Sequence, residues 1–238
     1  MIQILLDIHS HILPGVDDGA KNIDESLELL RMMKNQGITD VIATPHFYAN
    51  SDELEDYLKK IGDAYNVLKI AAANAALPNI YLGSEVLYYR YIGKSDSIYS
   101  FCFNNSGYLL LELSDNSIGA ELFEDINDLR ANLGVTPIIA HLERYYKYSG
   151  YKTFLKFIAE NGILAQVNAS SLFVPGYAKI AEKLIKNRLV NFIGTDAHSP
   201  NGRPPMMKQA LRLISEKLGA EYASGFIRNS QTLLEQIG

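Results

Sequence analysis

The sequence predicts an α/β fold of the barrel class, in which parallel strands alternate with helices. Short apolar runs alternate with longer amphipathic segments along the 238 residues, and this alternation is typical of a parallel sheet covered by helices. The apolar runs are nearly continuous, as expected for strands that are buried on both faces. Polar residues with metal-binding or catalytic potential follow these runs directly, and in a (β/α) barrel the carboxyl ends of all strands meet at one mouth.

Seven apolar runs are expected to form the strands, because each is short, rich in residues that pack well in sheets and bounded by turn-forming residues. In chain order they are Ile2–Ile8, Ile38–Thr44, Ile80–Val86, Tyr108–Leu113, Thr136–Ala140, Ile163–Val167 and Leu189–Thr195. An open doubly wound sheet would fit the same alternation, but the placement of the polar residues favours a barrel. We expect residues 1–238 to form a single domain.

Amphipathic helices are expected to follow the strands, since apolar residues there recur at helical spacing. They are Asn22–Gln36, a long helix from Ser51 or Asp52 to about Ala75, Ala120–Leu133, Lys152–Asn161, Tyr177–Asn187, Pro205–Leu218 and Glu221–Ile237. Gly37 and Pro78 mark the ends of the first two helices, because glycine commonly terminates a helix and proline cannot continue one.

The composition disfavours several classes of function. The net charge is −5 with acidic and basic residues interleaved, so no basic surface for nucleic acid is expected. No apolar stretch approaches the roughly 20 residues that span a bilayer, so no membrane insertion is expected. Cys102 is the only cysteine, which precludes an internal disulfide and favours a reducing, cytoplasmic location. The oligomeric state is not determined by these features.

All five histidines lie in short segments at strand ends, each beside a carboxylate or a second histidine. His9 and His11 are two residues apart on the first strand, so their side chains share a face and lie about 6–7 Å apart along it. Asp7 shares this face and could orient one of the imidazoles. The remaining histidines are His46, His141 and His198. This distribution indicates metal binding, with polar strand ends that bind nothing as the alternative.

Four carboxylates accompany the histidines. They are Asp18 in an Asp-Asp-Gly loop, Glu85 at the end of the third strand, Glu112 inside the apolar fourth strand, and Asp196 two residues before His198. A carboxylate in an apolar strand is costly unless it is paired or metal-bound, so an ion pair with lysine is the alternative for Glu112. Nine nitrogen and oxygen ligands exceed one tetrahedral zinc site and predict two or three divalent ions, with Mn²⁺, Fe²⁺ and Zn²⁺ as candidates.

Two arginines next to the ligand segments, Arg144 and Arg203, indicate an anionic substrate. Three divalent ions would outweigh the charge of four carboxylates, so the site would stay cationic. Phosphate fits best, because metal ions bind its oxygens and guanidinium groups bind it in bidentate fashion. A metal-bound water with its pKa lowered toward about 7 would be the nucleophile. Surface or helix-end salt bridges are the alternative role of the arginines.

Several longer motifs combine these residues. They are the segment from Asp7 to Gly19, Thr44-Pro45-His46, Gly83-Ser84-Glu85, His141-Leu142-Glu143-Arg144-Tyr145 and Gly194-Thr195-Asp196-Ala197-His198. They resemble the PHP (polymerase and histidinol phosphatase) superfamily and, within it, the bacterial manganese-dependent protein-tyrosine phosphatases of capsule and exopolysaccharide systems. The resemblance extends essentially from end to end. It implies a distorted, TIM-like (β/α)7 barrel with three metal ions at the carboxyl ends of the strands, with Mn²⁺ as the first candidate and Fe²⁺ or Zn²⁺ as alternatives.

The same resemblance implies a role for each site residue. His9, His11, Glu85 and Asp196 would hold one ion, Glu85, Glu112 and His141 a second, and Asp18, His46 and His198 a third. Arg144 and Arg203 would bind the phosphate. The implied substrate is the phosphorylated tyrosine-rich tail of a polysaccharide-assembly tyrosine kinase.

Two alternative functions remain open at this point. A small-molecule phosphatase such as histidinol phosphatase belongs to the same superfamily, and substrate profiling would distinguish it. A metal-bound regulatory module without catalysis is the non-enzymatic alternative, and the complete ligand set disfavours it. The aromatic segments Phe47-Tyr48 and Tyr88-Tyr89-Arg90-Tyr91 offer walls for a phosphotyrosine ring or, equally, packing at the barrel rim.

Overall fold

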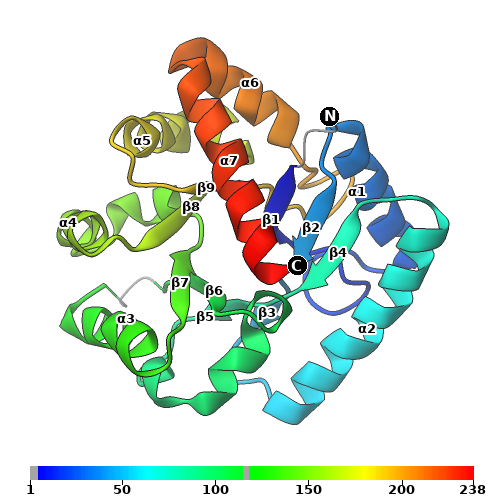
Figure 1. The fold of residues 1–238 in the computed structure, drawn as a ribbon, viewed down its shortest axis with the longest axis horizontal. Coiled ribbons are helices and arrows are strands. Elements are labelled where there is room, and N and C mark those ends of the chain that lie inside the picture. The colour runs from blue at the N-terminus through cyan, green and yellow to red at the C-terminus, as the bar shows by residue number, and fades with distance from the viewer. Residues whose placement is uncertain (1–4, 115–117) are drawn as a thin grey trace.

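The computed structural model describes residues 5–114 and 118–238, and it has the expected order of strands and helices (Figure 1). The strands described are β1 Leu6–Ser10, β2 Asp40–Ala43, β3 His46–Phe47, β4 Asn79–Leu82, β5 Glu85–Leu87, β6 Tyr108–Glu112, β7 Thr136–Ile139, β8 Leu164–Asn168 and β9 Phe192–Gly194. The α-helices described are α1 Ile23–Asn35, α2 Leu54–Asn74, α3 Ala120–Asn132, α4 Tyr151–Asn161, α5 Pro175–Lys186, α6 Met207–Lys217 and α7 Ala220–Ile237. The expected start of the first strand, Ile2, lies outside the described residues.

All strand pairs are parallel, and they form two sheets, β1-β2-β4 and β3-β5-β6-β7-β8-β9. The chain passes from one sheet to the other at two places. The second expected strand, Ile38–Thr44, gives β2, and β3 follows it directly after Pro45, whereas the third expected strand is split into β4 and β5. Counted as one bent strand each, these pairs reduce the nine segments described to the seven strands of the predicted barrel.

Local hydrogen bonding explains why these two strands are broken. Pro45 separates β2 from β3 and has no N–H to donate to a neighbouring strand. Between β4 and β5, the N–H of Ser84 donates to the carbonyl of Phe101, which ends the 3-10 helix Asp96–Phe101 and lies outside the sheet. The expectation of one continuous strand from Ile80 to Val86 was therefore wrong in detail.

The circle of strands is closed by the segment that follows β9. The N–H of Asp196 donates to the carbonyl of His9 at 2.8 Å, and the N–H of His11 donates to the carbonyl of Ala197 at 2.9 Å. Asp7 reinforces this junction, because its carboxylate accepts from the backbone and hydroxyl of Thr195 at 2.9 and 2.5 Å. The distorted (β/α)7 barrel is thus confirmed.

One end of the barrel is covered by α7, which crosses in front of the strands in Figure 1. Leu233 and Ile237 of α7 belong to the apolar cluster of the barrel interior, with strand residues such as Ile8 and Ile138. The side chain of Asn229 on α7 donates to the carbonyl of Asn191, just before β9 begins. The helix therefore lies at the amino ends of the strands and leaves their carboxyl ends open.

The ends of the first two helices depart little from expectation. Asn22 caps α1 as a side-chain acceptor for the N–H of Glu25 at 3.0 Å, the usual role of asparagine at this position. The second helix begins later than expected, at Leu54, because the carboxylate of Asp52 accepts instead from the N–H of Tyr48 at 2.6 Å. The loop before α2 is thereby held against the segment that follows β3.

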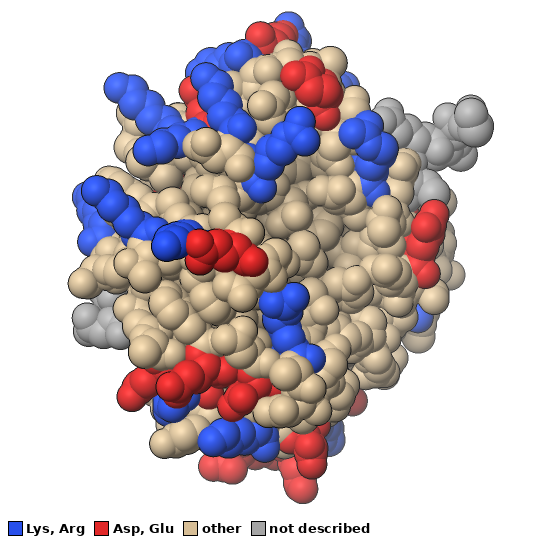
Figure 2. Space-filling model, turned by 60° about the vertical axis from the view of Figure 1, so that its left-hand side comes forward, with Lys and Arg blue, Asp and Glu red and all other residues tan. Residues whose placement is uncertain are grey.

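The charged surface is mixed, as the interleaved sequence predicts. On the face drawn in Figure 2, lysine and arginine side chains lie among acidic ones, and several acidic side chains gather toward its lower edge. Among the described helices, none combines the length and apolar character needed to cross a membrane.

Candidate metal centre

The nine predicted ligand side chains all meet at the carboxyl ends of the strands. Most of them are buried, although each carries a polar or charged head group. The buried members are His9, His11, Glu85, His141, Asp196 and His198. His46 and Glu112 are partly buried, and the side chain of Asp18 is 65% exposed at the mouth. Burial of this many ionisable groups is unfavourable unless a cation or a hydrogen-bond network compensates it.

The deepest group consists of His9, His11, Glu85 and Asp196. The Glu85 Oε2 atom lies 3.1 Å from His9 Nε2 and 3.2 Å from His11 Nε2. Asp196 Oδ1 lies 3.5 Å from each of the same two nitrogens. Ligand atoms of His9, His11 and Asp196 all fall within 4.8 Å of one another, close enough to share one ion.

Glu112 and His141 lie on the other side of Glu85. His141 Nε2 is 2.9 Å from Glu85 Oε1 and 3.4 Å from Glu112 Oε1. His46 also approaches this pair, with Nδ1 at 3.2 Å from Glu85 Oε2 and 3.8 Å from Glu112 Oε2. Glu85 thus faces His141 through Oε1, and His9, His11 and His46 through Oε2.

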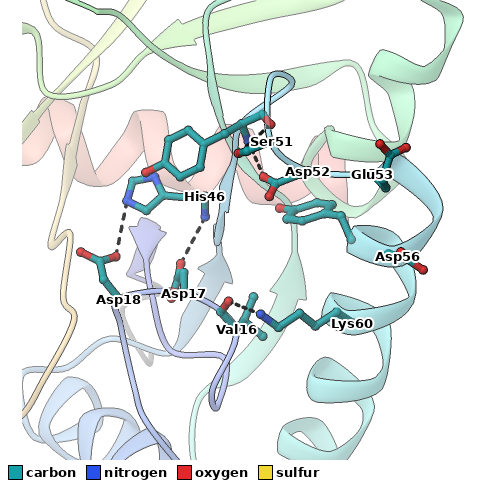
Figure 3. Close-up of a pocket in the computed structure, with 11 residues that line it drawn as sticks. Val16, Asp17, Asp18, His46, Ser51, Asp52, Glu53, Asp56 and Lys60 are labelled. Atoms are coloured by element: carbon teal, nitrogen blue, oxygen red, sulfur yellow. Dashed lines mark hydrogen bonds and ion pairs between the residues drawn. The ribbon is translucent and has the colours of Figure 1, made fainter.

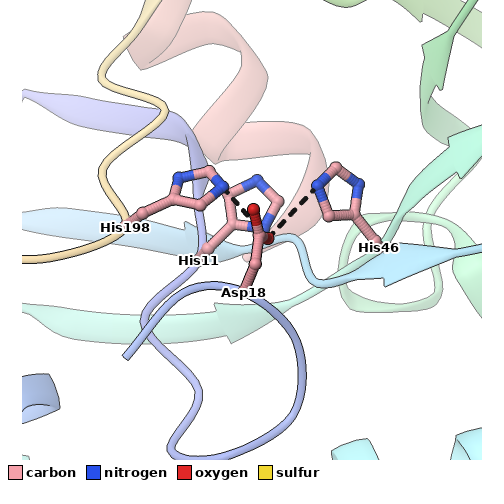
Figure 4. A group of neighbouring side chains, drawn as sticks. All are labelled: His11, Asp18, His46 and His198. Atoms are coloured by element: carbon pink, nitrogen blue, oxygen red, sulfur yellow. Dashed lines mark ion pairs between the residues drawn. The ribbon is translucent and has the colours of Figure 1, made fainter. Parts of the chain in front are cut away.

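The outermost group contains Asp18, His46 and His198, with His11 beside them (Figure 4). Asp18 Oδ1 lies 3.3 Å from His198 Nε2 and 3.6 Å from His46 Nε2. Members of each ligand set that the resemblance implies thus lie near one another, but the group of close ligand atoms around Glu85 and Glu112 contains His46. The geometry adds that His11 and His46 each lie between two sets.

Hydrogen bonds fix which nitrogen of three imidazoles faces the centre. The contacts are His9 Nδ1 to Gln166 Oε1 at 3.3 Å, His11 Nδ1 to Asp17 Oδ2 at 2.7 Å and His198 Nδ1 to the Asp196 carbonyl at 3.0 Å. Each partner is an acceptor, so Nδ1 carries the hydrogen and Nε2 is left to face the other ligands. This arrangement is typical of metal-bound histidine.

Two further contacts indicate that a cation belongs here. His9 Nε2 and His11 Nε2 lie 3.2 Å apart, a distance that two lone pairs tolerate only with a proton or a metal ion between them. Among the described residues, His46 Nδ1 and His198 Nε2 are buried without a hydrogen-bond partner, although carboxylate oxygens lie nearby. The residues present therefore fit bound metal ions.

The electrostatics of the pocket favour positive charge. Burial alone would lower the pKa of His11, but its contacts to Asp17 and Glu85 raise that pKa to about 10. Burial would raise the pKa of Glu85, yet the charge of His9 and hydrogen bonds to His11 and His141 hold it well below its usual value. In the absence of metal, protons thus occupy positions that a metal ion would take, and metal binding must displace them.

The predicted arginines converge on the side of Asp196 that faces away from the histidines. Arg144 Nη2 and Arg203 Nη2 donate to Asp196 Oδ2 at 2.6 and 2.5 Å. Their side chains remain 34% and 43% exposed, so the guanidinium groups border both the metal ligands and solvent. A guanidinium has five N–H donors, and one contact to Asp196 leaves others for an anion at the mouth.

A cleft of about 600 Å³ opens beside the outermost group (Figure 3). His46 and Tyr48 line it, and their rings stack with centroids 5.3 Å apart. Phe47, by contrast, is buried against Tyr57 and Phe101. Of the two aromatic residues after β2, only Tyr48 is thus placed to contact a ligand ring, and Phe47 belongs to the core.

A family model described as capsular polysaccharide synthesis, CpsB/CapC, matches residues 5–235. The chain belongs to the CpsB/CapC family. The tyrosine-protein phosphatase CpsB of Streptococcus pneumoniae is 30% identical to it over 97% of this chain and 98% of that protein. The expectation from the sequence motifs is confirmed at the level of the family.

Solved structures agree with this assignment. One comes from work on YwqE of Bacillus subtilis and CpsB of Streptococcus pneumoniae, described as unique metal-dependent tyrosine phosphatases. It matches with a TM-score of 0.87 at 26% identity, covering 98% of this chain and 96% of that one. A histidinol phosphate phosphatase of Lactococcus lactis, at 14% identity and a TM-score of 0.53 over 94% and 93% of the two chains, shares the fold alone.

Several residues that contact the centre of this CpsB/CapC member were not singled out from the sequence. Asp17 accepts from His11 Nδ1 and from the N–H groups of Gly19 and His46. Gly19 allows this loop to lie on His11, because a Cβ there would be 2.1 Å from the His11 carbonyl oxygen. Both are part of the Asp-Asp-Gly motif, so the motif itself was the available signal.

Asp7 has a different role from the one expected. Its carboxylate accepts from the backbone of His9 and from Thr195 rather than from an imidazole. Burial raises the pKa of Asp7 to about 6, against the opposing effect of its hydrogen bonds to Thr195 and His9. Asp7 thus holds the ligand-bearing backbone at the barrel closure.

Proposed function

We propose that this protein is a metal-dependent phosphatase that hydrolyses phosphotyrosine on proteins. The observation that carries the proposal is the convergence of nine ligand side chains with two arginines at one end of the barrel. Family membership and full-length similarity to tyrosine phosphatases support it. We propose further that residues 1–238 form one phosphatase domain.

The ligand groups support three divalent ions, for which Mn²⁺ is our first candidate, ahead of Fe²⁺ and Zn²⁺. Nitrogen and oxygen donors without thiolate suit all three of these metals. The proposed ligand sets are His9, His11, Glu85 and Asp196 for the first ion, Glu85, Glu112 and His141 for the second, and Asp18, His46 and His198 for the third. Bound ions would supply Lewis-acid activation of the phosphoryl group and of the attacking water.

The residues of the protein have distinct tasks in this scheme. Arg144 and Arg203 bind the phosphate oxygens and stabilise the charge that develops on them. Asp17 keeps His11 turned with Nε2 toward the centre, as its 2.7 Å contact to Nδ1 indicates. Tyr48 forms an aromatic wall of the adjoining cleft, where it can pack against the ring of a phosphotyrosine.

The substrate we propose is the phosphorylated tyrosine-rich tail of a polysaccharide-assembly tyrosine kinase, so that the enzyme would regulate capsule or exopolysaccharide production from the cytoplasm. The CpsB/CapC family description, capsular polysaccharide synthesis, supports this context. The aromatic wall beside the metal centre favours an aryl phosphate over a small alkyl phosphate.

A substrate and metal test addresses the proposal directly. Purified protein loaded with Mn²⁺ is expected to hydrolyse phosphotyrosine peptides with a higher kcat/KM than histidinol phosphate. Complete chelation should abolish both activities, and added Mn²⁺ should restore them. Preference for histidinol phosphate would replace the proposal with a small-molecule phosphatase, and full metal occupancy without turnover of any phosphoester would indicate a regulatory module.

Replacement of Cys102 by serine is expected to leave phosphatase activity essentially unchanged. Burial raises the pKa of the Cys102 thiol to about 12, and a thiol held in this form is neither a nucleophile nor readily alkylated. Treatment of the wild-type enzyme with iodoacetamide should likewise have little effect, as measured by phosphotyrosine hydrolysis. Loss of activity in both experiments would point to a cysteine mechanism and refute the metal-dependent one.

A further inference from the structure

Strand β8 supplies none of the nine predicted ligands, yet two of its side chains contact the ligand segments. Gln166 and Asn168 are two residues apart and point to the same face of the strand, and both are fully buried. Gln166 Oε1 accepts from the N–H of His141 at 2.8 Å and lies 3.3 Å from His9 Nδ1. Asn168 Nδ2 donates to Asp196 Oδ2 at 2.6 Å.

The two amides form a chain with a single possible direction. The backbone N–H of His141 can only donate, so the atom of Gln166 that it contacts is the carbonyl oxygen. The amide nitrogen of Gln166 then donates to Asn168 Oδ1 at 2.6 Å. That leaves the Asn168 amide nitrogen to donate to the carboxylate of Asp196, which can only accept when ionised.

This direction determines the state of His9. Because Gln166 Oε1 is an acceptor, His9 Nδ1 must carry a hydrogen in the contact between them. The His9 Nε2 atom is then the one that faces Glu85 and Asp196. One chain of side-chain hydrogen bonds therefore links ligand segments on β1, after β7 and after β9.

The packing of β9 supports a specific role for this contact. Gly194 lies between Gln166 and His9, and a Cβ at this position would be 2.8 Å from Gln166 Nε2 and 2.7 Å from His9 Cβ. Absence of a side chain at Gly194 is what allows the amide of β8 to reach the imidazole of β1 across β9.

We propose that Gln166 and Asn168 are positioning residues that set the metal affinity of this centre. Gln166 fixes the tautomer of His9 and the backbone of His141, and Asn168 holds Asp196 in place. The inference rests on the proposed function, because it assumes that these side chains bind metal. It predicts that the ions held by His9, Asp196 and His141 depend on β8, whereas an ion held by Asp18, His46 and His198 does not.

The test is the binding of Mn²⁺ to chelator-stripped protein, measured by equilibrium dialysis with metal analysis. Gln166→Leu is expected to weaken the tightest binding by about 10- to 100-fold and to lower the number of ions bound at a fixed Mn²⁺ concentration. Gln166→Glu keeps an acceptor for His9 Nδ1 and for the His141 N–H but loses the donor to Asn168 Oδ1, so it should recover only part of that loss. Asn168→Ala should weaken binding less than Gln166→Leu, because Arg144 and Arg203 still donate to Asp196 Oδ2.

Asn191→Ala is the matched control. The Asn191 side chain accepts from the N–H of Ala165 at 3.1 Å, so this variant removes a hydrogen bond to the same strand at its other end. It should bind Mn²⁺ like the wild type. Thermal unfolding of each metal-free variant establishes that it is folded.

The outcomes separate the two proposals. Wild-type protein that takes up no Mn²⁺ would overturn the proposed function together with this inference. Wild-type protein that binds Mn²⁺ while Gln166→Leu binds equally well would overturn the inference alone. A Gln166→Glu variant that binds Mn²⁺ as weakly as Gln166→Leu would also overturn the inference. Equal binding would mean that residue 166 only packs in the core, where an acceptor for His9 and His141 makes no difference.

Discussion

Glu85→Gln is expected to lower phosphatase activity by about 10³-fold or more, since metal ions contribute several kcal/mol of transition-state stabilisation and each 1.4 kcal/mol is about tenfold in rate. Glu85 is only 1% exposed and faces His9 and His11 through one oxygen and His141 through the other. An amide has nearly the same shape but lacks the charge, and one of its two positions becomes a donor. This one substitution should therefore weaken the binding of two metal ions.

The measurement combines kcat/KM on a phosphotyrosine peptide with metal content per protein after equilibration in Mn²⁺. Glu55→Gln, an exposed position on α2, is the control for the same chemical change and should match the wild type in both. A Glu85→Gln enzyme that retains full metal content and activity would show that the shared carboxylate is not a ligand.

Arg144→Ala and Arg203→Ala are each expected to lower kcat by about 10²- to 10³-fold, the range found when one group that stabilises a developing negative charge is removed. Metal content should stay close to that of the wild type. The structural reason is that Asp196 Oδ2 also accepts from Asn168 Nδ2 at 2.6 Å, so the carboxylate remains held when one guanidinium is lost. Replacement by lysine should recover only part of the activity, since lysine lacks the planar fork.

The metal content of the same arginine variants distinguishes phosphate binding from a role in holding Asp196. If Arg144→Ala loses its metal ions along with its activity, the contact to Asp196 is its main role and phosphate binding is not. Arg212→Ala, which removes an exposed arginine paired with Glu216 on α6, is the matched control and should change neither quantity.

Much of the fold could be predicted from local patterns. The seven strands were visible because each is a short apolar run between turn residues, and the helices because their apolar residues recur at helical spacing. The division of the third strand into β4 and β5 did not follow from these patterns. It depends on the acceptor of the Ser84 N–H, which is the carbonyl of Phe101 in the 3-10 helix Asp96–Phe101, and hydrophobic patterning carries no information about that contact.

In the candidate site, too, some residues could be predicted from the sequence and others could not. Side chains such as Glu112 and His141 stand out in the sequence, because burial of a charged or imidazole group beside an apolar strand is costly unless a partner or a metal ion compensates it. Gln166 and Asn168 sit in an equally apolar segment but gave a weaker signal, since an uncharged amide can be satisfied in many ways. Their importance follows from contacts to His9 and Asp196, which lie far away along the chain.

The barrel, the family and the residues at the carboxyl ends of the strands could be predicted from the amino-acid sequence. These follow from short-range periodicity and from residue types whose burial is costly without a partner. The folded structure was needed to establish which ligands face one another and that Glu85 lies between two groups. It was also needed to show that side chains of β8 hydrogen-bond to residues of β1 and of the segments after β7 and β9. Those relations depend on the closure of the barrel, where Asp196 and Ala197 pair with β1 and bring side chains from opposite ends of the chain within hydrogen-bonding distance.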